Sequence, residues 1–169
     1  MNRHISFGLD TFGDVTAVPH DQVLRDVVAE AVEADRVGVD VFGVGEHHRD
    51  DYAISAPDIV LAAIAGQTEN IRLTTSVIVL SSDDPVRIFE RFSTLQAISS
   101  GRAEMTLGRG SFTESFPLFG LDLRDYERLF EEKLELMRVL LDADASRSPI
   151  AWDRGPRHLY PPTATPLQA

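Results

Sequence analysis

Apolar residues recur along the first 140 or so residues in two alternating patterns. Short runs rich in Val, Ile and Thr are typical of strands, and each is followed by a stretch whose apolar residues recur every three or four positions, as on one face of a helix. The pattern predicts strands at 5–9, 39–45, 71–80 and 103–107, and helices at 20–38, 57–70, 85–101 and 123–141. Four β-α units in this order predict an α/β fold with a parallel sheet and right-handed crossovers.

The ends of the predicted helices carry ordinary boundary signals. Pro57 and Pro85 stand where a first turn would begin, Asp84 is placed to cap the third helix, and Gly38 and Gly101 follow the last apolar positions of two helices. Each helix has one apolar face that we expect to be buried. The last three faces comprise Ile59, Val60, Ala63 and Ile64, then Ile88, Phe89, Phe92, Leu95 and Ile98, then Tyr126, Leu129, Phe130, Leu134, Met137 and Leu141.

The pattern changes near residue 146. Five of the nine prolines lie between Pro149 and Pro166, and no periodic apolar face follows. We therefore predict one folded domain at 1–145 and a Pro-rich irregular segment at 146–169.

Charge and composition narrow the class of function. The 169 residues include 27 acidic and 16 basic side chains, a formal charge of −11 that is spread along the chain. A surface of this sign repels nucleic acids and anionic membranes, so a small-molecule role is favoured. The absence of cysteine excludes disulfides, a thiol nucleophile and a thiolate metal site. No apolar run approaches the ~18 residues of a membrane span, and we expect a cytoplasmic protein.

Potential proton chemistry is concentrated at the end of the second predicted strand, where Glu46, His47 and His48 follow one another. The carboxyl ends of parallel strands are where ligands bind in such folds. A histidine there can act as an acid or a base near neutral pH. The alternative is that one histidine packs under a loop or caps the next helix. A metal site is disfavoured, because neighbouring strand residues point to opposite faces.

Two other strand ends carry candidate binding residues. Arg109 lies between Gly108 and Gly110, where a phosphate can approach the backbone and a guanidinium can bind it. The alternative is an arginine paired with a surface carboxylate. Asp10 ends the first strand, where it either lines the ligand-binding end of the sheet or caps a loop. Three phenylalanines after Arg109 form either a pocket wall or part of the core, namely Phe112, Phe116 and Phe119.

Three motifs occur in order along the chain. They read Gly-Glu-His-His at 45–48, Ser-Val-Ile-Val-Leu at 76–80 with Asp-Pro-Val-Arg at 84–87, and Ile-Ser-Ser-Gly-Arg-Ala-Glu-Met-Thr-Leu-Gly-Arg-Gly at 98–110. Together with residues 119–120, 126 and 130–132 they resemble the bacterial luciferase-like monooxygenase family, from residue 5 to about residue 168. Members of that family are TIM barrels that bind reduced FMN or, in some branches, the deazaflavin F420. They use it to activate oxygen for attack on an organic substrate, or to move a hydride.

The resemblance implies roles for individual residues. It places Glu46 and His47 at the flavin face of the barrel mouth as catalytic residues. It places Arg109, with Gly110 beside it, at the flavin phosphate. Asp10 is expected to line the cofactor mouth.

Ser76 and Val77 match the place where many family members have a non-proline cis peptide under the flavin ring. For this chain we expect an ordinary trans strand, because half a barrel lacks the neighbours that would enforce a cis bond. The two residues remain candidates for cofactor binding.

The resemblance covers about the first four of eight β-α units, since a full barrel needs about 250 residues. We therefore expect a half barrel that acts as a flavin-dependent monooxygenase or oxidoreductase once a second copy or another chain supplies the second half. The alternative is a truncated, non-catalytic remnant that binds flavin weakly or serves as a partner subunit. The substrate, and the choice between FMN and F420, stay open.

Overall fold

The computed structural model describes residues 5–142 and Trp152. The elements follow one another in the order β1 (Gly8–Thr11), α1 (His20–Val37), β2 (Val41–Val44), α2 (Pro57–Ala65), β3 (Arg72–Thr75), β4 (Ile78–Val79), α3 (Pro85–Ile98), β5 (Leu107–Gly108), α4 (Ser115–Leu118), the 3-10 helix η1 (Leu123–Asp125) and α5 (Tyr126–Asp142). The predicted alternation of strands and helices is confirmed.

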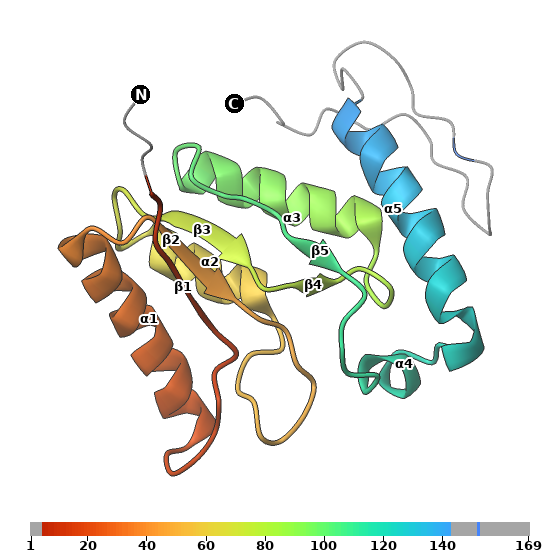
Figure 1. Cartoon of the computed structure of the whole chain (residues 1–169), viewed down its shortest axis with the longest axis horizontal. Helices are drawn as coiled ribbons and strands as arrows, with labels where there is room; N and C mark the ends of the chain where they lie inside the picture. Colours follow the sequence, from red (N-terminus) through yellow and green to blue (C-terminus); the bar gives the residue numbers. More distant parts are fainter. Residues whose placement is uncertain (1–4, 143–151, 153–169) are drawn as a thin grey trace.

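All paired strands are parallel, as predicted (Figure 1). One sheet has the order β1-β2-β3, a second contains β4 and β5, and a parallel bridge between Leu73 and Ala103 links β3 to the segment before β5. The order across the described strands is therefore β1, then β2, then β3 followed along the chain by β4, and then β5 with the segment before it. Within the described residues β1 and β5 are the outer strands, and no closed barrel is present.

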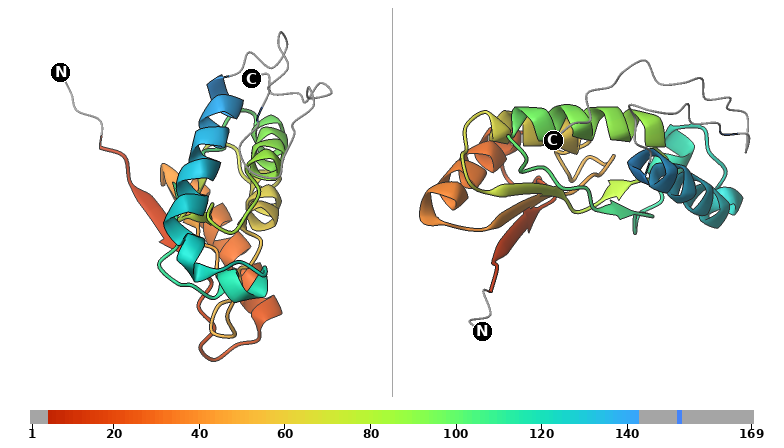
Figure 2. Two further views of the ribbon diagram at one scale, coloured as in Figure 1. Left: turned by 90° about the vertical axis from the view of Figure 1, so that its right-hand side faces the viewer. Right: turned by 90° about the horizontal axis from the view of Figure 1, so that it is seen from above.

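The core lies between the sheet and the helices. Figure 2 shows α2 and α3 along one face of the sheet, and α1 packs against α2 while α5 packs against α3. The strands contribute buried Phe42, Val44 and Leu73 to this layer. Helix α1 contributes Val23, Val27, Ala31 and Ala34, which recur at the spacing expected for one helical face.

Helices α1, α2 and α3 begin where the sequence signals place them, but α2 ends at Ala65 with Gly66 as its C-cap, so the predicted end at residue 70 was wrong. The Asp84 carboxylate accepts hydrogen bonds from the backbone N–H groups of Val86 and Arg87, so it caps α3 as predicted. Gly38 ends α1 with φ 84°, a left-handed conformation that glycine adopts without a steric penalty.

The predicted apolar faces were wrong at several positions. Ile59, Ile98, Leu134 and Leu141 are exposed. In α5 the buried residues are Leu136, Met137 and Leu140, so Met137 is confirmed, whereas Leu136 and Leu140 were not predicted. Helix α5 packs against α3, and within the described residues its apolar side chains that do not face α3 remain exposed.

The expected single strand at 71–80 is divided into β3 and β4. The peptide bond between Ser76 and Val77 is cis, so the expectation of a trans strand was wrong. That expectation assumed that the segments on either side of this peptide bond would be missing. Both β2 and the segment before β5 are present and lie beside it. The Ser76 N–H donates to the Val44 carbonyl (2.9 Å) and the Ile78 N–H donates to the Thr106 carbonyl (3.0 Å).

Two side chains fasten the amino-terminal end of the sheet. The Asp35 carboxylate accepts hydrogen bonds from the backbone N–H groups of residues 69–71, directly before β3. The Arg102 guanidinium donates to the backbone carbonyls of Ala65, Thr68 and Ile71, and to that of Ser99. These bonds fix the loop after α2 at the end of the sheet opposite the predicted site.

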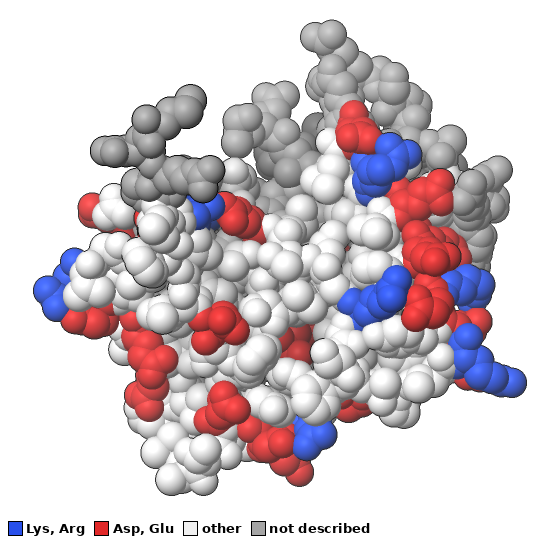
Figure 3. Space-filling model, viewed as in Figure 1, with Lys and Arg blue, Asp and Glu red and all other residues white. Residues whose placement is uncertain are grey.

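The face of the sheet away from α2 and α3 is polar. Hydrogen bonds join side chains across it, namely Arg72 with Glu104 (2.8 Å), Thr74 with Thr106 (3.0 Å) and Ser76 with Asp10 (3.4 Å). Figure 3 shows this side of the molecule, where charged residues gather toward the edges and the centre is mainly uncharged. We call it the open face.

The structure tests only some of the remaining sequence predictions. No helix in residues 5–142 has the length and apolar character needed to cross a membrane. The irregular segment predicted at 146–169 lies outside the described residues except for Trp152, which packs against the core. The domain boundary at residue 145 stays a prediction.

Candidate functional site

The loops after β1 and β2 and the segment that contains α4 lie at the same, lower end of the molecule in Figure 1. Strand β2 leads directly into Glu46, His47 and His48 at this end. The two histidines are paired with different carboxylates, because successive side chains of an extended segment point in opposite directions.

Glu46 and His48 form one of these pairs. Glu46 Oε1 lies 2.9 Å from His48 Nε2, and Glu46 Oε2 accepts the backbone N–H of Val79 at 3.1 Å. Their side chains are only 8% and 10% exposed. Glu46 therefore ties the end of β2 to β4, with both carboxylate oxygens engaged.

His47 lies in an aromatic box formed by Phe12, Tyr52 and Phe112. Its ring stacks on Tyr52 with centroids 4.2 Å apart, while Phe12 and Phe112 approach edge-on at 5.4 and 4.8 Å. Its backbone N–H donates to the Ile54 carbonyl. These contacts fix the plane of the imidazole ring.

The carboxylate of Glu114 completes the surroundings of His47. Glu114 Oε1 lies 3.2 Å from His47 Nδ1, and the side chains of His47 and Glu114 are 10% and 20% exposed. Burial raises the pKa of Glu114. Hydrogen bonds from its own backbone, from His47 and from the His48 backbone lower the pKa by more than burial raises it, so the pKa lies below its ordinary value. Glu114 is therefore ionised at neutral pH.

Sequence reasoning missed Glu114. It stands directly before the short helix α4, which periodicity did not predict, and it is 67 residues from His47. The available signal was its place in the loop after the fourth strand, since loops at the carboxyl ends of parallel strands converge.

Asp10 and Ser76 come together on the open face, and Val77 follows Ser76. Ser76 Oγ lies 3.4 Å from Asp10 Oδ2. Val77 packs closely on Gly108, where an added Cβ would lie 2.4 Å from Val77 Cγ2. A Cβ at Gly45 would meet both the Phe12 ring (2.2 Å) and the Ser76 carbonyl (3.2 Å), so the aromatic box adjoins the Ser76–Val77 peptide.

Arg109 is paired with a surface carboxylate, which is the alternative interpretation that the sequence left open. Its guanidinium lies 3.3 Å from the Glu127 carboxylate and 4.8 Å above the Phe130 ring, and its side chain is 46% exposed. No contact joins it to His47 or Ser76 in the described structure. Its proposed role at a phosphate is therefore not visible in this arrangement.

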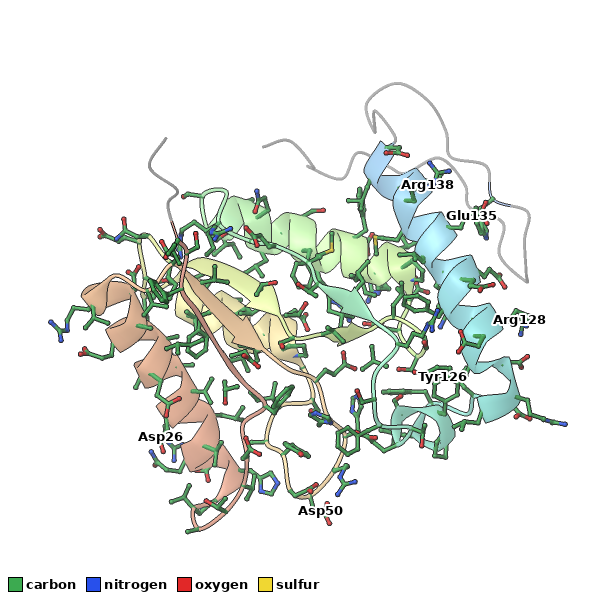
Figure 4. All side chains as sticks on the ribbon, viewed as in Figure 1. Asp26, Asp50, Tyr126, Arg128, Glu135 and Arg138 are labelled. Carbon is green, nitrogen blue, oxygen red and sulfur yellow. The ribbon has the colours of Figure 1, made fainter. Side chains whose placement is uncertain are left out.

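Gly110 is fixed against the start of α5. Its φ of 78° is left-handed, and its carbonyl accepts a hydrogen bond from the Tyr126 hydroxyl at 2.7 Å. Figure 4 labels Tyr126 at the beginning of α5, beside the segment that contains α4. The Arg109–Gly110 turn is thus held by α5.

The three candidate phenylalanines lie in different surroundings. Phe116 is buried and packs near Tyr126, with ring centroids 5.5 Å apart. Phe112 belongs to the aromatic box, and the edge of Phe119 meets His48 at 5.1 Å. The loop after β5 therefore covers both histidines.

A cavity beside Glu46 is too small for a flavin ring. It has a volume of about 70 Å³ and is lined by residues that include Asp58, Asp83 and Arg91. Arg91 forms ion pairs with both of these carboxylates. A ligand of flavin size must therefore lie outside this cavity.

The amino-acid sequence was compared with models of protein families. The model described as luciferase-like monooxygenase matches residues 5–168. The chain belongs to the luciferase-like monooxygenase family. The resemblance noted from the three sequence motifs is thereby confirmed.

A family relative and two solved structures illustrate the similarity. N-acetyl-S-alkylcysteine monooxygenase from Bacillus subtilis is 33% identical over 115 residues, which are 66% of this chain and 34% of that protein. The oxygenating constituent of 3,6-diketocamphane monooxygenase from Pseudomonas putida, solved with FMN, superposes with a TM-score of 0.82 at 21% identity, covering 94% of this chain and 45% of the other. An F420-dependent secondary alcohol dehydrogenase, solved with an F420-acetone adduct, gives 0.75 at 18% identity, covering 93% and 47%.

The lengths differ in a consistent way. This luciferase-like chain matches about a third of the length of the curated relatives and spans about half the length of the solved structures. The structural likeness at low identity shows a shared α/β fold with parallel strands.

Proposed function

We propose that this chain provides the flavin-binding face of a flavin-dependent oxidoreductase or monooxygenase that acts on a small organic substrate. The observation that carries the proposal is the grouping of Asp10, Ser76 and Val77 on the open face, directly beside the aromatic box that holds His47. Membership of the luciferase-like monooxygenase family supports it. The FMN and F420 found in two structural neighbours support the class of cofactor.

The residues of the open face fit the edge of a flavin ring. A flavin ring system has a polar edge with carbonyl oxygens and an N–H group, and Asp10 offers an acceptor while Ser76 offers a hydroxyl that donates or accepts. Both are accessible on the open face. A bound reduced flavin would supply the electrons for oxygen activation or hydride transfer, and the protein would hold and orient it.

Arg109 is our candidate for the cofactor phosphate. Its guanidinium is half exposed, and its ion-pair partner Glu127 is an exposed carboxylate. An exposed ion pair contributes only about 0–1 kcal/mol, so a phosphate can compete for the arginine. The bidentate geometry of a guanidinium suits a phosphate well.

His47 and Glu46 would have different roles in the reaction. His47 is held by ring contacts and one carboxylate, which suits an acid or base that must stay in place. Both oxygens of Glu46 already have partners, so Glu46 acts by fixing the end of β2 against β4. We therefore assign proton transfer to His47 and positioning to Glu46.

The second half of the site would come from outside these residues. Strands β1 and β5 are the outer strands of the described sheet, and Ile5, Phe7 and Leu9 are exposed on and before β1. Unpaired strand edges with apolar side chains are sites of strand addition. We propose that the chain is a half barrel of four units completed by a second copy or by a separate chain.

A flavin titration tests the proposal. FMN or F420 is added to the purified chain, and binding is followed by the change in cofactor fluorescence. Arg109→Ala should weaken binding at least about tenfold, because a charge-assisted bond to a phosphate is lost. Arg25→Ala is the matched control, since Arg25 forms an exposed ion pair with Asp21 on α1.

The outcomes separate the two functional hypotheses. Binding that is weakened by Arg109→Ala and not by Arg25→Ala supports the flavin site. A chain that binds neither cofactor at any concentration tested, either by itself or with a separately supplied second half, would overturn it and favour the alternative, a non-catalytic partner subunit.

A further inference from the structure

The two neighbouring histidines differ in the atom that their carboxylate contacts. Glu46 faces Nε2 of His48 at 2.9 Å, whereas Glu114 faces Nδ1 of His47 at 3.2 Å. A neutral imidazole carries one N–H, and an ionised carboxylate only accepts hydrogen bonds. The proton of neutral His47 should therefore lie on Nδ1, which leaves a lone pair on Nε2.

We propose that Glu114 is a positioning residue that holds His47 in its Nδ1–H tautomer and thereby makes Nε2 the proton-accepting atom of the site. The tautomer follows from the geometry of this chain alone. Only the catalytic use of Nε2 rests on the proposed function.

The aromatic box cannot select the tautomer by itself. Tyr52 stacks on the face of the imidazole, and Phe12 and Phe112 approach edge-on. Stacking contacts of this kind fix the ring plane but distinguish poorly between two orientations related by a half-turn about the Cβ–Cγ bond. A carboxylate beside one ring nitrogen does distinguish them, because only an N–H can donate to it.

The other charged groups near the box already have partners. The Arg49 guanidinium lies 5.2 Å from the centre of the Phe112 ring and forms two hydrogen bonds of 2.8 Å with the Asp51 carboxylate. Glu114 is the carboxylate within hydrogen-bonding distance of the His47 ring in the described structure. The pairing also links the loop after β5 to the end of β2.

Nuclear magnetic resonance of the chain labelled with ¹⁵N in histidine measures the tautomer without any cofactor. Long-range ¹H–¹⁵N correlations show which ring nitrogen carries the proton in each of the five histidines. The His47 signals are assigned by their loss in His47→Gln. The spectra are recorded in alkaline buffer, so that the imidazole rings are neutral.

Neutral His47 should show the Nδ1–H pattern in the unmodified chain. Glu114→Ala should shift the tautomer ratio at least about tenfold toward Nε2–H, because a charge-assisted hydrogen bond is lost. Glu114→Gln retains a carbonyl acceptor and should restore part of the preference. Glu90→Ala removes an exposed glutamate paired with Arg87 on α3, and should change nothing at His47.

An Nε2–H pattern in the unmodified chain, or an unchanged ratio in both Glu114 variants, would overturn the inference. A merely structural role for Glu114 would lower stability without moving the tautomer ratio. Failure of this test leaves the flavin titration unaffected, and failure of flavin binding leaves the tautomer assignment intact, so the two results are distinguishable.

Discussion

The carboxylate of Glu46 connects two strands through two different kinds of partner. One oxygen contacts the His48 ring and the other accepts the backbone N–H of Val79. The sequence identified Glu46 as chemically important from its place after a buried strand. It did not reveal that both oxygens are engaged, because Val79 is 33 residues away and is brought close only by the parallel pairing of strands.

Glu46→Gln should destabilise the fold by about 1–3 kcal/mol, because a buried charged acceptor is lost while its two donors remain. Urea unfolding monitored by circular dichroism measures this free energy. Glu104→Gln is the matched control. Glu104 forms a half-exposed ion pair with Arg72, so its loss should cost under about 1 kcal/mol. Equal effects of the two substitutions would contradict the structural role of Glu46.

Gly108→Ala should also be destabilising, since the added Cβ would lie 2.4 Å from Val77 Cγ2. Overpacking of this kind typically costs about 1–3 kcal/mol. Gly66→Ala provides the comparison, because its Cβ would have no neighbour closer than 3.8 Å. Thermal unfolding of both variants measures the loss of stability. A Gly108→Ala protein as stable as the parent would show that Val77 does not pack there as described.

Among the elements, the helices were the most predictable. The ends of α1 and α3 follow from Gly38, Asp84 and Pro85, which act through local backbone geometry. The division of residues 71–80 into β3 and β4 does not follow from hydrophobic periodicity, because this stretch rich in Ile, Val and Thr contains no Gly or Pro that would interrupt a strand at Ser76 and Val77. The buried side of α5 depends on its contact with α3, a tertiary relation that periodicity alone leaves open.

The link between α1 and β3 through Asp35 should depend on pH. Burial raises the pKa of Asp35, but hydrogen bonds from the backbone N–H groups of Glu69, Ile71 and Asn70 lower it more, so the folded pKa lies below the ordinary value. A lowered folded pKa stabilises the fold above the unfolded pKa of about 3.9, and this contribution is lost as the pH falls through the folded pKa.

Asp35→Asn should therefore reduce the free energy of unfolding by on the order of 1 kcal/mol at pH 7, and by less at pH 3. Urea unfolding of both proteins at the two pH values measures the difference. A cost that is the same at pH 3 as at pH 7 would show that the Asp35 charge is not what fixes the loop before β3.

At the scale of the whole molecule, family and fold class were readable from the sequence because three ordered motifs and four β-α units agree. The partner of Arg109 was less predictable. A strand-end arginine can bind a phosphate or a neighbouring carboxylate, and in this structure it lies against Glu127 and Phe130. Within residues 5–142, β1 and β5 are the outer strands of the described sheets.

The most direct test of the account combines size-exclusion chromatography with light scattering, with and without FMN and F420, and records cofactor absorbance in the protein peak. We expect a discrete assembly that carries cofactor, formed by the chain with itself or with a separately supplied second half. A chain that stays free of cofactor in every assembly, including one with such a second half, would contradict the claim that its open face binds a flavin.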